Sequence, residues 1–271
     1  MSFAGVVRNR LWQVRIRLAK RKLLAGVEPD ALEAAVNDWP RSLNDPTGFY
    51  LDCFRYFHFE LPSEVRAHRH YFERCARGFG EEAFHAMWYL IFRLFAPRHF
   101  LEIGVYRGQV LSLASLLPRS MGKGGDVAGI SPFDSVGDSV SEYRTGIDYF
   151  ADTQANFEHF GLPKPLLLKA FSTDEAALNL IRSRPWDCIY IDGNHDYEIA
   201  KADWDNCSGN LKPAGLIVLD DAGLGTSFKP PIFASSGHFG PSRVAAEIDP
   251  AGFKEILQVG HNRVFQKQPS G

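Results

Sequence analysis

The stretch Phe100-Leu101-Glu102-Ile103-Gly104-Val105-Tyr106-Arg107-Gly108 decides the fold. Its apolar residues predict a buried strand that stops at a glycine-containing turn, and residues 109–117 predict the helix that follows. A strand that passes into a helix through glycines brings backbone N–H groups and the positive helix end to the carboxyl edge of a parallel sheet. Parallel sheets bind ligands at that edge, so we expect a cofactor site here.

The spacing of the glycines indicates which kind of cofactor fits. A dinucleotide fingerprint, G-x-G-x-x-G, needs its middle glycine so that the backbone can approach a pyrophosphate. In this chain Gly104 and Gly108 are present, but Tyr106 occupies the middle position. The carboxylate of Glu102, at the end of the strand, also disfavours a diphosphate. The sequence therefore favours a nucleoside-type ligand without phosphates and disfavours an NAD-dependent oxidoreductase.

The pattern Glu102-x-Gly104-x-x-x-Gly108 resembles the first motif of class I S-adenosylmethionine-dependent methyltransferases. The resemblance implies that Glu102 contacts the amino acid end of the cofactor and that Gly104 and Gly108 let the cofactor lie across the turn. Tyr106, inside the motif, is expected to contact it as well. The residues alone also allow an ordinary strand, turn and helix whose glycines reverse the chain.

Two further strands are expected to reach the same cofactor. In the methyltransferase pattern the second strand, here residues 126–130, ends in an acidic residue that binds the ribose hydroxyls. This chain has Ser131 at that position, so either Ser131 makes the contact or Asp134 reaches back. The third strand, residues 166–170, leads to an exit that lies beside the adenine in the family. There Ser172 is a candidate contact, although it could also cap the next helix.

Carboxylates follow two more apolar segments, residues 186–191 and 216–219. One helix separates these segments, and a right-handed crossover makes them parallel neighbours whose carboxyl ends lie about 5 Å apart. Asp192, Asp220 and Asp221 should therefore converge. Three carboxylates at one edge repel one another unless a cation neutralises them, and all-oxygen ligands favour Mg²⁺ or Mn²⁺. The alternative is that these aspartates cap helices or turns.

Residues 191–198 (IDGNHDYE) and 211–221 (LKPAGLIVLDD) closely resemble a methyltransferase group that includes bacterial sugar and macrolide O-methyltransferases. They are also similar to catechol O-methyltransferases and to cephalosporin-hydroxylase-like proteins. The resemblance covers roughly residues 98–267. It implies a divalent ion, held by the aspartates, that orients two substrate oxygens, with His195 at the position of the proposed base. A near-neutral histidine suits proton removal, although a turn residue bonded to a carbonyl is the alternative for His195.

Length and composition allow one large α/β core with a smaller appendage, because the chain has 271 residues and 45% hydrophobic content. We expect an N-terminal helical extension over residues 1–80 and a class I methyltransferase domain over residues 81–271. The domain should contain a doubly wound, Rossmann-like, mostly parallel seven-stranded sheet with an antiparallel last strand. The Gly/Pro/Ser-rich stretch 222–242 should overhang the metal as an acceptor-binding loop, with His238 as a second candidate base.

The N-terminus differs in charge from the rest of the chain. Residues 1–27 contain seven basic residues and no acidic one, which leaves 23 basic and 32 acidic residues in the remainder, a formal charge of −9. Val7, Leu11, Val14 and Leu18 follow helical spacing and predict a basic amphipathic helix. Residues 1–24 could lie on an anionic membrane surface, or the helix could pack on its own domain or on a second subunit.

The remaining expectations concern location, partners and reaction. The four cysteines lack C-x-x-C spacing, and we expect a cytoplasmic protein, with the inner face of the membrane as an alternative site. We expect a homo-oligomer, a small-molecule or glycan acceptor and no nucleic-acid partner. The expected reaction is S-adenosylmethionine-dependent, divalent-metal-assisted methylation of a hydroxyl on a sugar or glycosylated natural product. The alternatives are methylation of a catechol-like small molecule, a non-catalytic role, or a cephalosporin-hydroxylase-like activity.

Overall fold

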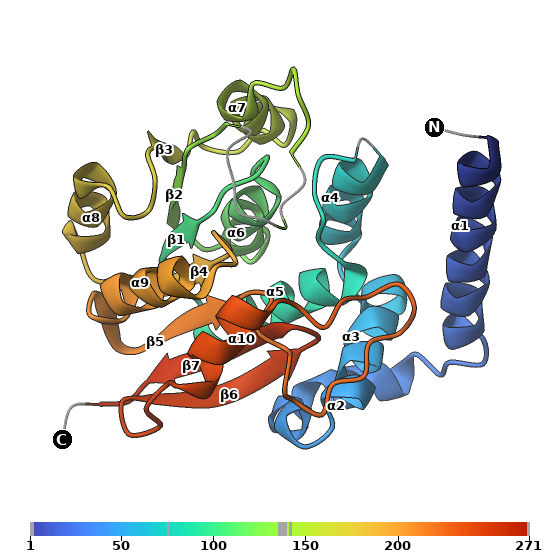
Figure 1. Cartoon of the computed structure of the whole chain (residues 1–271). Coiled ribbons are helices and arrows are strands. Elements are labelled where there is room, and N and C mark those ends of the chain that lie inside the picture. The colour runs from blue at the N-terminus through green and yellow to red at the C-terminus, as the bar shows by residue number, and fades with distance from the viewer. Residues whose placement is uncertain (1–2, 75, 135–139, 141–142, 270–271) are drawn as a thin grey trace.

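The computed structural model describes residues 3–74, 76–134, 140 and 143–269, with side chains from residue 10 onward (Figure 1). The helices that precede the sheet are α1 (Phe3–Leu24), α2 (Asp30–Asn37), the 3₁₀ helix η1 (Trp39–Leu43), α3 (Pro46–Phe59), α4 (Ser63–Arg74) and α5 (Glu82–Phe95). The strands are β1 (His99–Ile103), β2 (Asp126–Ser131), β3 (Leu166–Lys169), β4 (Trp186–Ile191), β5 (Leu211–Leu219), β6 (Phe253–Val259) and β7 (Asn262–Lys267). The helices between them are α6 (Gln109–Ser120), α7 (Tyr149–His159), α8 (Glu175–Arg182), α9 (Tyr197–Ser208) and α10 (Phe239–Ala246).

The seven strands form one sheet in the order β3-β2-β1-β4-β5-β7-β6. Strands β1 to β5 are parallel, and β7 is antiparallel to both β5 and β6. The predicted Rossmann-like sheet with an antiparallel last strand is therefore confirmed. The strand order reverses direction beside β1, so the β1 and β4 ends form the crevice where such sheets bind ligands.

Each face of the sheet is buried against helices because its strands are apolar on both sides. In β1, Phe100 belongs to the core shared with α5 and α6, while Leu101 belongs to the core shared with α8 and α9. In Figure 1 the N-terminal helices gather beyond the first of these faces. Trp88 of α5 joins that layer to the sheet, with its ring 5.6 Å from that of Phe100 and 5.2 Å from that of Tyr190.

The N-terminal helices continue the core of the sheet domain. Val36 of α2 and Phe57 of α3 are buried in the same hydrophobic cluster as residues of β1 and β5. The long loop after β5 also packs on α3, where Phe228 lies 5.4 Å from Tyr50 and Phe233 lies 5.3 Å from Phe54. The expected boundary near residue 80 stays a prediction.

The proline and glycine within residues 212–215 (KPAG) favour a turn, but in the structure this stretch lies inside β5, where Ala214 has a φ of 61° and interrupts the strand without ending it. The last helix is α10, Phe239–Ala246, whose second residue, Gly240, packs closely on the backbone of His195, since a Cβ there would lie 2.1 Å from the His195 carbonyl oxygen. Residues 135–139 and 141–142 of the polar stretch after β2 lie outside the described residues. Within the described part, no helix has the length and apolar character needed to cross a membrane.

Candidate active site

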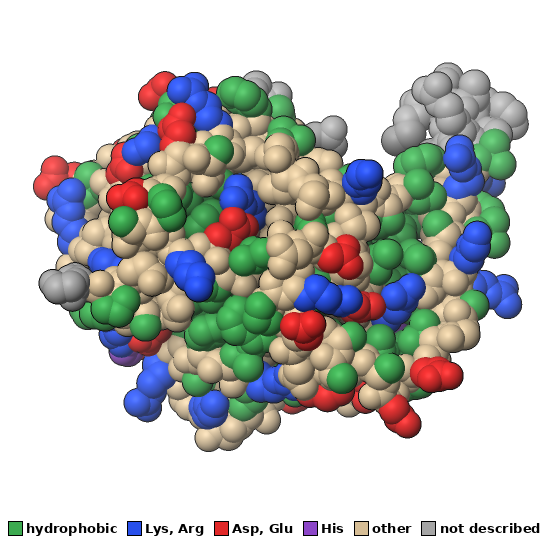
Figure 2. Space-filling view, turned by 90° about the horizontal axis from the view of Figure 1, so that it is seen from below, with side chains coloured by type: hydrophobic (Ala, Val, Ile, Leu, Met, Phe, Trp, Pro, Cys, Tyr) green, Lys and Arg blue, Asp and Glu red, His purple; other side chains and the backbone are tan. Residues whose placement is uncertain are grey.

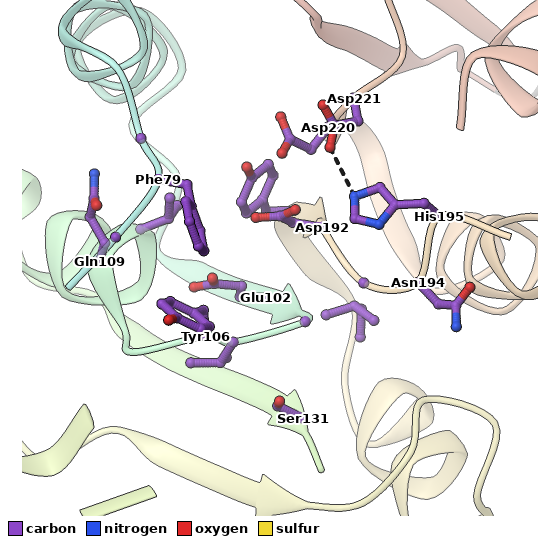
Figure 3. A pocket seen from close by; sticks show the side chains of 18 of the residues that line it. Phe79, Glu102, Tyr106, Gln109, Ser131, Asp192, Asn194, His195, Asp220 and Asp221 are labelled. Atoms are coloured by element: carbon purple, nitrogen blue, oxygen red, sulfur yellow. Dashed lines mark hydrogen bonds and ion pairs between the residues drawn. The ribbon is translucent and has the colours of Figure 1, made fainter. Parts of the chain in front are cut away.

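A cavity of about 760 Å³ lies at the carboxyl ends of β1, β2, β4 and β5 (Figure 3). Most of the residues that the sequence places in a site line it. They are Glu102, Gly104, Tyr106, Ser131, Ser172, Asp192, His195, Asp220 and Asp221. Gly108 and Asp134 are not among the described lining residues, and their contact with a cofactor stays a prediction. The cavity joins the glycine turn to the aspartate cluster.

The two glycines of the turn have different structural roles. Gly104 has a φ of +96°, and a Cβ there would lie 1.9 Å from the backbone oxygen of Asp192. This glycine therefore lets the β1 and β4 ends approach each other beneath the cavity. Gly108 has a φ of +75° and precedes α6, where a Cβ would lie 2.7 Å from the side chain of Thr153. Gly108 thus reverses the chain and seats α6 against α7.

Replacing Gly104 by Ala should destabilise the protein and open the cavity floor. The left-handed φ and the contact with Asp192 together should cost at least ~2 kcal/mol, which lowers the melting temperature by several degrees. Gly122→Ala is the matched control, because Gly122 has a φ of +68° but nothing within 4 Å of the added methyl. Thermal unfolding of both variants measures the contribution of the contact, and equal shifts in the two would show that the close approach contributes nothing.

Glu102 is a buried acid aimed into the cavity (Figure 3). Burial raises the pKa of Glu102 to about 8, and the nearby carboxylate of Asp220 adds to the rise. Its Oε2 atom has no hydrogen-bond partner in the described part of the chain. A buried carboxyl oxygen without a hydrogen-bond partner is costly unless a ligand satisfies it. The site is therefore suited to a ligand that brings a positive charge or a hydrogen-bond donor to Glu102.

The affinity for S-adenosylhomocysteine should depend on pH through Glu102. Glu102 must lose its proton to pair with the ammonium group of this ligand, so affinity should rise as the pH increases from 6 towards the pKa of about 8 and then level off. Calorimetric titrations at several pH values measure this dependence. Glu102→Gln should bind more weakly and with a flat profile between pH 6 and 8; a variant that keeps the wild-type rise would exclude Glu102 as its source.

The β2 and β3 ends contribute two serines. Ser131 is buried at the end of β2, and its Oγ accepts a hydrogen bond from the backbone N–H of Phe133 at 3.2 Å. Its hydroxyl proton is therefore available to a ligand in the cavity. Asp134 is exposed in the following bend, three residues further along the chain. Ser172 is half-buried at the cavity wall after β3.

The aspartates converge as the topology requires. The backbone N–H of Asp192 donates to Ile103 of β1 at 2.8 Å, and that of Asp220 donates to Ile191 of β4 at 3.0 Å. These bonds continue the sheet by one residue and bring the two carboxyls into hydrogen-bond contact. Burial, followed by the charge of Asp220, raises the pKa of Asp192 well above its usual range. The pair therefore holds a proton that a bound cation would replace.

A histidine that sequence reasoning missed stands over this cluster. His261 Nε2 lies 3.4 Å from Asp220 Oδ1 and 3.7 Å from Asp221 Oδ1. Burial alone would lower its pKa, but the carboxylates of Asp220 and Asp221 raise the pKa of His261 to about 10. The strand topology alone could have predicted the position of His261. His261 sits in the turn between β6 and β7, and an antiparallel β7 beside β5 must begin where β5 ends.

A second missed residue comes from the N-terminal part of the chain. Glu81, just before α5, lines the cavity and accepts a hydrogen bond from the hydroxyl of Tyr50 at 2.5 Å. Burial raises the pKa of Glu81 to about 7, although the charge of His261 opposes the rise. No motif surrounds Glu81, and only the packing of α3 and α5 against the sheet brings it to the site.

His195 is anchored to the aspartate cluster. Its Nε2 lies 2.8 Å from Asp221 Oδ2, as the dashed line in Figure 3 shows. The ring of His238 lies 4.4 Å from that of His195, and its Nε2 is 3.7 Å from the same carboxylate oxygen. Asp221 has a left-handed φ of 51°, which the His238 N–H fixes by donating to the Asp221 carbonyl at 2.8 Å. Both predicted candidate bases therefore face one carboxylate.

The donor set fits a divalent cation. Asp221 with His195 and His238 brings three candidate ligand atoms within 4.8 Å of one another, and so do Asp220 and Asp221 with His261, whose ring would have to lose its proton to bind a cation. Asp220 Oδ1 is buried, and the ion pair with His261 Nε2 at 3.4 Å is its contact in the described part of the chain. Carboxylate oxygens suit Mg²⁺ and Mn²⁺, and imidazole nitrogens suit Mn²⁺ better than Mg²⁺.

Comparison with known proteins shows what this domain and its fold are similar to. Residues 101–222 match the family model of a methyltransferase domain, and no curated protein sequence matches the chain. An O-methyltransferase from Bacillus cereus, solved with S-adenosylhomocysteine, aligns with a TM-score of 0.52 at 15% identity, over 86% of this chain and 100% of that one. A methyltransferase from Podospora anserina, also bound to S-adenosylhomocysteine, gives 0.53 at 17% identity, over 78% and 89%. An O-methyltransferase of tomaymycin synthesis from Streptomyces achromogenes gives 0.50 at 15% identity, over 84% and 99%. At these identities the similarity concerns the fold.

Proposed function

We propose that this protein transfers a methyl group from S-adenosylmethionine to a hydroxyl oxygen, with the help of a divalent cation. The premise is that the chain contains a methyltransferase domain within a class I methyltransferase fold. We further propose that the acceptor is a sugar or a glycosylated natural product. The observation that carries the proposal is the single cavity that joins Glu102 and Gly104 to the Asp192, Asp220 and Asp221 cluster. A methyl donor at the first group and an acceptor at the second would share one enclosed space.

The cofactor end of the cavity fits S-adenosylmethionine. Glu102 would pair with its ammonium group, Ser131 would meet the ribose, and Ser172 would lie near the adenine. The bound sulfonium supplies the methyl group. The protein's part in the transfer is to hold the acceptor oxygen in line with that methyl group, and such positioning contributes most of the rate in a displacement of this kind.

The acceptor end of the cavity supplies proton removal. Asp192, Asp220 and Asp221 would hold the cation, which neutralises the carboxylates and lowers the pKa of an acceptor hydroxyl. His195 would take the hydroxyl proton, because its ring borders the cavity and Asp221 fixes its orientation at 2.8 Å. Formation of the oxygen–carbon bond would break the methyl–sulfur bond, whose electron pair stays on the sulfur of the departing S-adenosylhomocysteine, and the acceptor proton would pass to His195 and then to solvent.

The polar character of the acceptor end supports a hydroxyl-rich acceptor. Glu81, His238 and His261 surround the aspartates with further hydrogen-bonding groups. A sugar offers several hydroxyls to such a wall, whereas a catechol offers two hydroxyls and an apolar ring. Phe84 and Trp88 also line the cavity, so a sugar attached to an apolar aglycone would match both kinds of surface.

Methyl transfer from labelled S-adenosylmethionine tests this proposal. The protein is incubated with monosaccharides, glycosylated natural products and catechol, with Mg²⁺, with Mn²⁺ or with a chelator. We expect label in a glycosylated acceptor only when a divalent ion is present. Transfer to catechol alone would show that the acceptor is not a sugar. Full activity with chelator would show that the reaction needs no divalent cation.

A further inference from the structure

Helix α1 is held to the rest of the protein near its C-terminal end. Lys20 pairs with Glu82 of α5, and its ammonium lies 5.2 Å from the ring of Phe233. The Arg55 side chain donates to the backbone carbonyl of Leu23 at 3.2 Å. In Figure 1, α1 lies at the edge of the molecule, apart from the sheet. From Arg10 to Arg15 every side chain of the helix is exposed and thus accessible to a partner.

The helix has two apolar faces, and only one of them is docked. At 100° per residue, Ile16, Ala19 and Leu23 share one side, and all three are half-buried against the body. Leu11, Val14 and Leu18 share the opposite side and are 62%, 49% and 60% exposed. We call this second set the outer stripe. Its residues belong to the helical pattern seen in the sequence, and their exposure shows that they lie outside the protein core.

Basic side chains border the outer stripe on both sides. By the same helical spacing, Arg10, Arg17 and Arg21 lie along one edge and Arg15 and Lys22 along the other, and all five are exposed. No acidic residue occurs between residues 1 and 27. Figure 2 shows the edge of the molecule formed by α1 with Lys and Arg side chains and hydrophobic ones among them. An apolar stripe between two cationic edges is the pattern of a helix that lies flat in a lipid interface.

We propose that α1 binds the surface of an anionic membrane through the outer stripe, with Leu11, Val14 and Leu18 entering the headgroup region and the flanking arginines contacting lipid phosphates. Both edges are cationic, which matches a plane of negative charge better than it matches the groove of a protein partner. The docked face with Lys20 would keep the catalytic domain attached to the bound helix. This inference does not depend on the proposed reaction, since no described residue of α1 lines the cavity.

Flotation with lipid vesicles tests the proposal on the full-length protein. We expect binding to vesicles of phosphatidylcholine with phosphatidylglycerol, loss of binding in high salt, and little binding to phosphatidylcholine alone. Each basic residue near an anionic surface contributes about fivefold in affinity, so R10Q/R17Q/R21Q should bind about 100-fold more weakly. L11Q/L18Q should also bind weakly while keeping its helical circular dichroism.

The matched control is K123Q/K164Q/K254Q, which removes the same charge from exposed lysines outside α1. It should bind vesicles like the wild type. An equal loss of vesicle binding in this control would show that binding depends only on net charge, and would contradict a site on α1. Absence of wild-type binding to anionic vesicles would overturn the proposal, as would a dimer in size-exclusion chromatography that L11Q/L18Q converts to monomer, because a second copy would then occupy the outer stripe.

Discussion

Asp220→Asn should lower methyl transfer by more than ~100-fold, the effect of losing the cation's stabilisation of a developing alkoxide. Asp220 is buried in hydrogen-bond contact with Asp192, and its Oδ1 lies 3.4 Å from His261 Nε2. Asparagine keeps the shape of the side chain but removes the negative charge that attracts the cation. Steady-state rates at increasing Mg²⁺ concentration measure the loss, and we expect saturation to shift to a much higher concentration.

Two controls separate this effect from misfolding. Asp220→Asn should still bind S-adenosylhomocysteine, because the cofactor end of the cavity is intact. Glu158→Gln, which removes an exposed carboxylate on α7, should keep wild-type rates. If Asp220→Asn turned over normally and with an unchanged Mg²⁺ dependence, the aspartates would have no role in holding a cation, and the alternative role as turn caps would stand.

His195→Ala should lower the rate about 100- to 10,000-fold, the range for loss of a positioned general base. The ring is oriented by Asp221 at 2.8 Å, and no other described imidazole is anchored to Asp221 at hydrogen-bond distance. Binding of the cofactor should be unchanged.

His238→Ala is the matched control for this prediction, because His238 faces the same carboxylate at 3.7 Å without hydrogen-bond contact. A larger loss of rate in His238→Ala than in His195→Ala would show that His238, and not His195, is the general base. Added imidazole should partly restore His195→Ala if the missing group is a base. Failure of rescue together with a raised Mg²⁺ requirement would instead make His195 a ligand of the cation.

The sheet and the aspartate cluster could be predicted because local patterns fix them. Short apolar runs that end in Gly104, Asp192 and Asp220 predict parallel strands, and the right-handed crossover then places their ends side by side. The backbone bonds from Asp192 to β1 and from Asp220 to β4 follow directly from that register. The glycine turn was predictable for the same reason, although Gly108 serves the approach of α6 to α7 and does not line the cavity.

The acceptor wall could not be predicted because it depends on packing between distant segments. Glu81 reaches the cavity only through the packing of α3 and α5 on the sheet, and its neighbours in sequence carry no motif. His261 follows from the antiparallel hairpin, but recognising it requires knowing that the turn meets the end of β5. The two apolar faces of α1 likewise look alike in sequence, and only the body of the protein distinguishes the docked face from the outer stripe.

Calorimetric titration with S-adenosylmethionine and with S-adenosylhomocysteine tests the central claim most directly. Ser131 stands where the methyltransferase sequence pattern has an acidic residue, so cofactor binding is the first step to measure. We predict micromolar binding of both ligands by the wild type, retained with chelator and weakened in Glu102→Gln. No binding of either ligand, with or without Mg²⁺, would contradict a methyltransferase and favour a non-catalytic protein that keeps the fold.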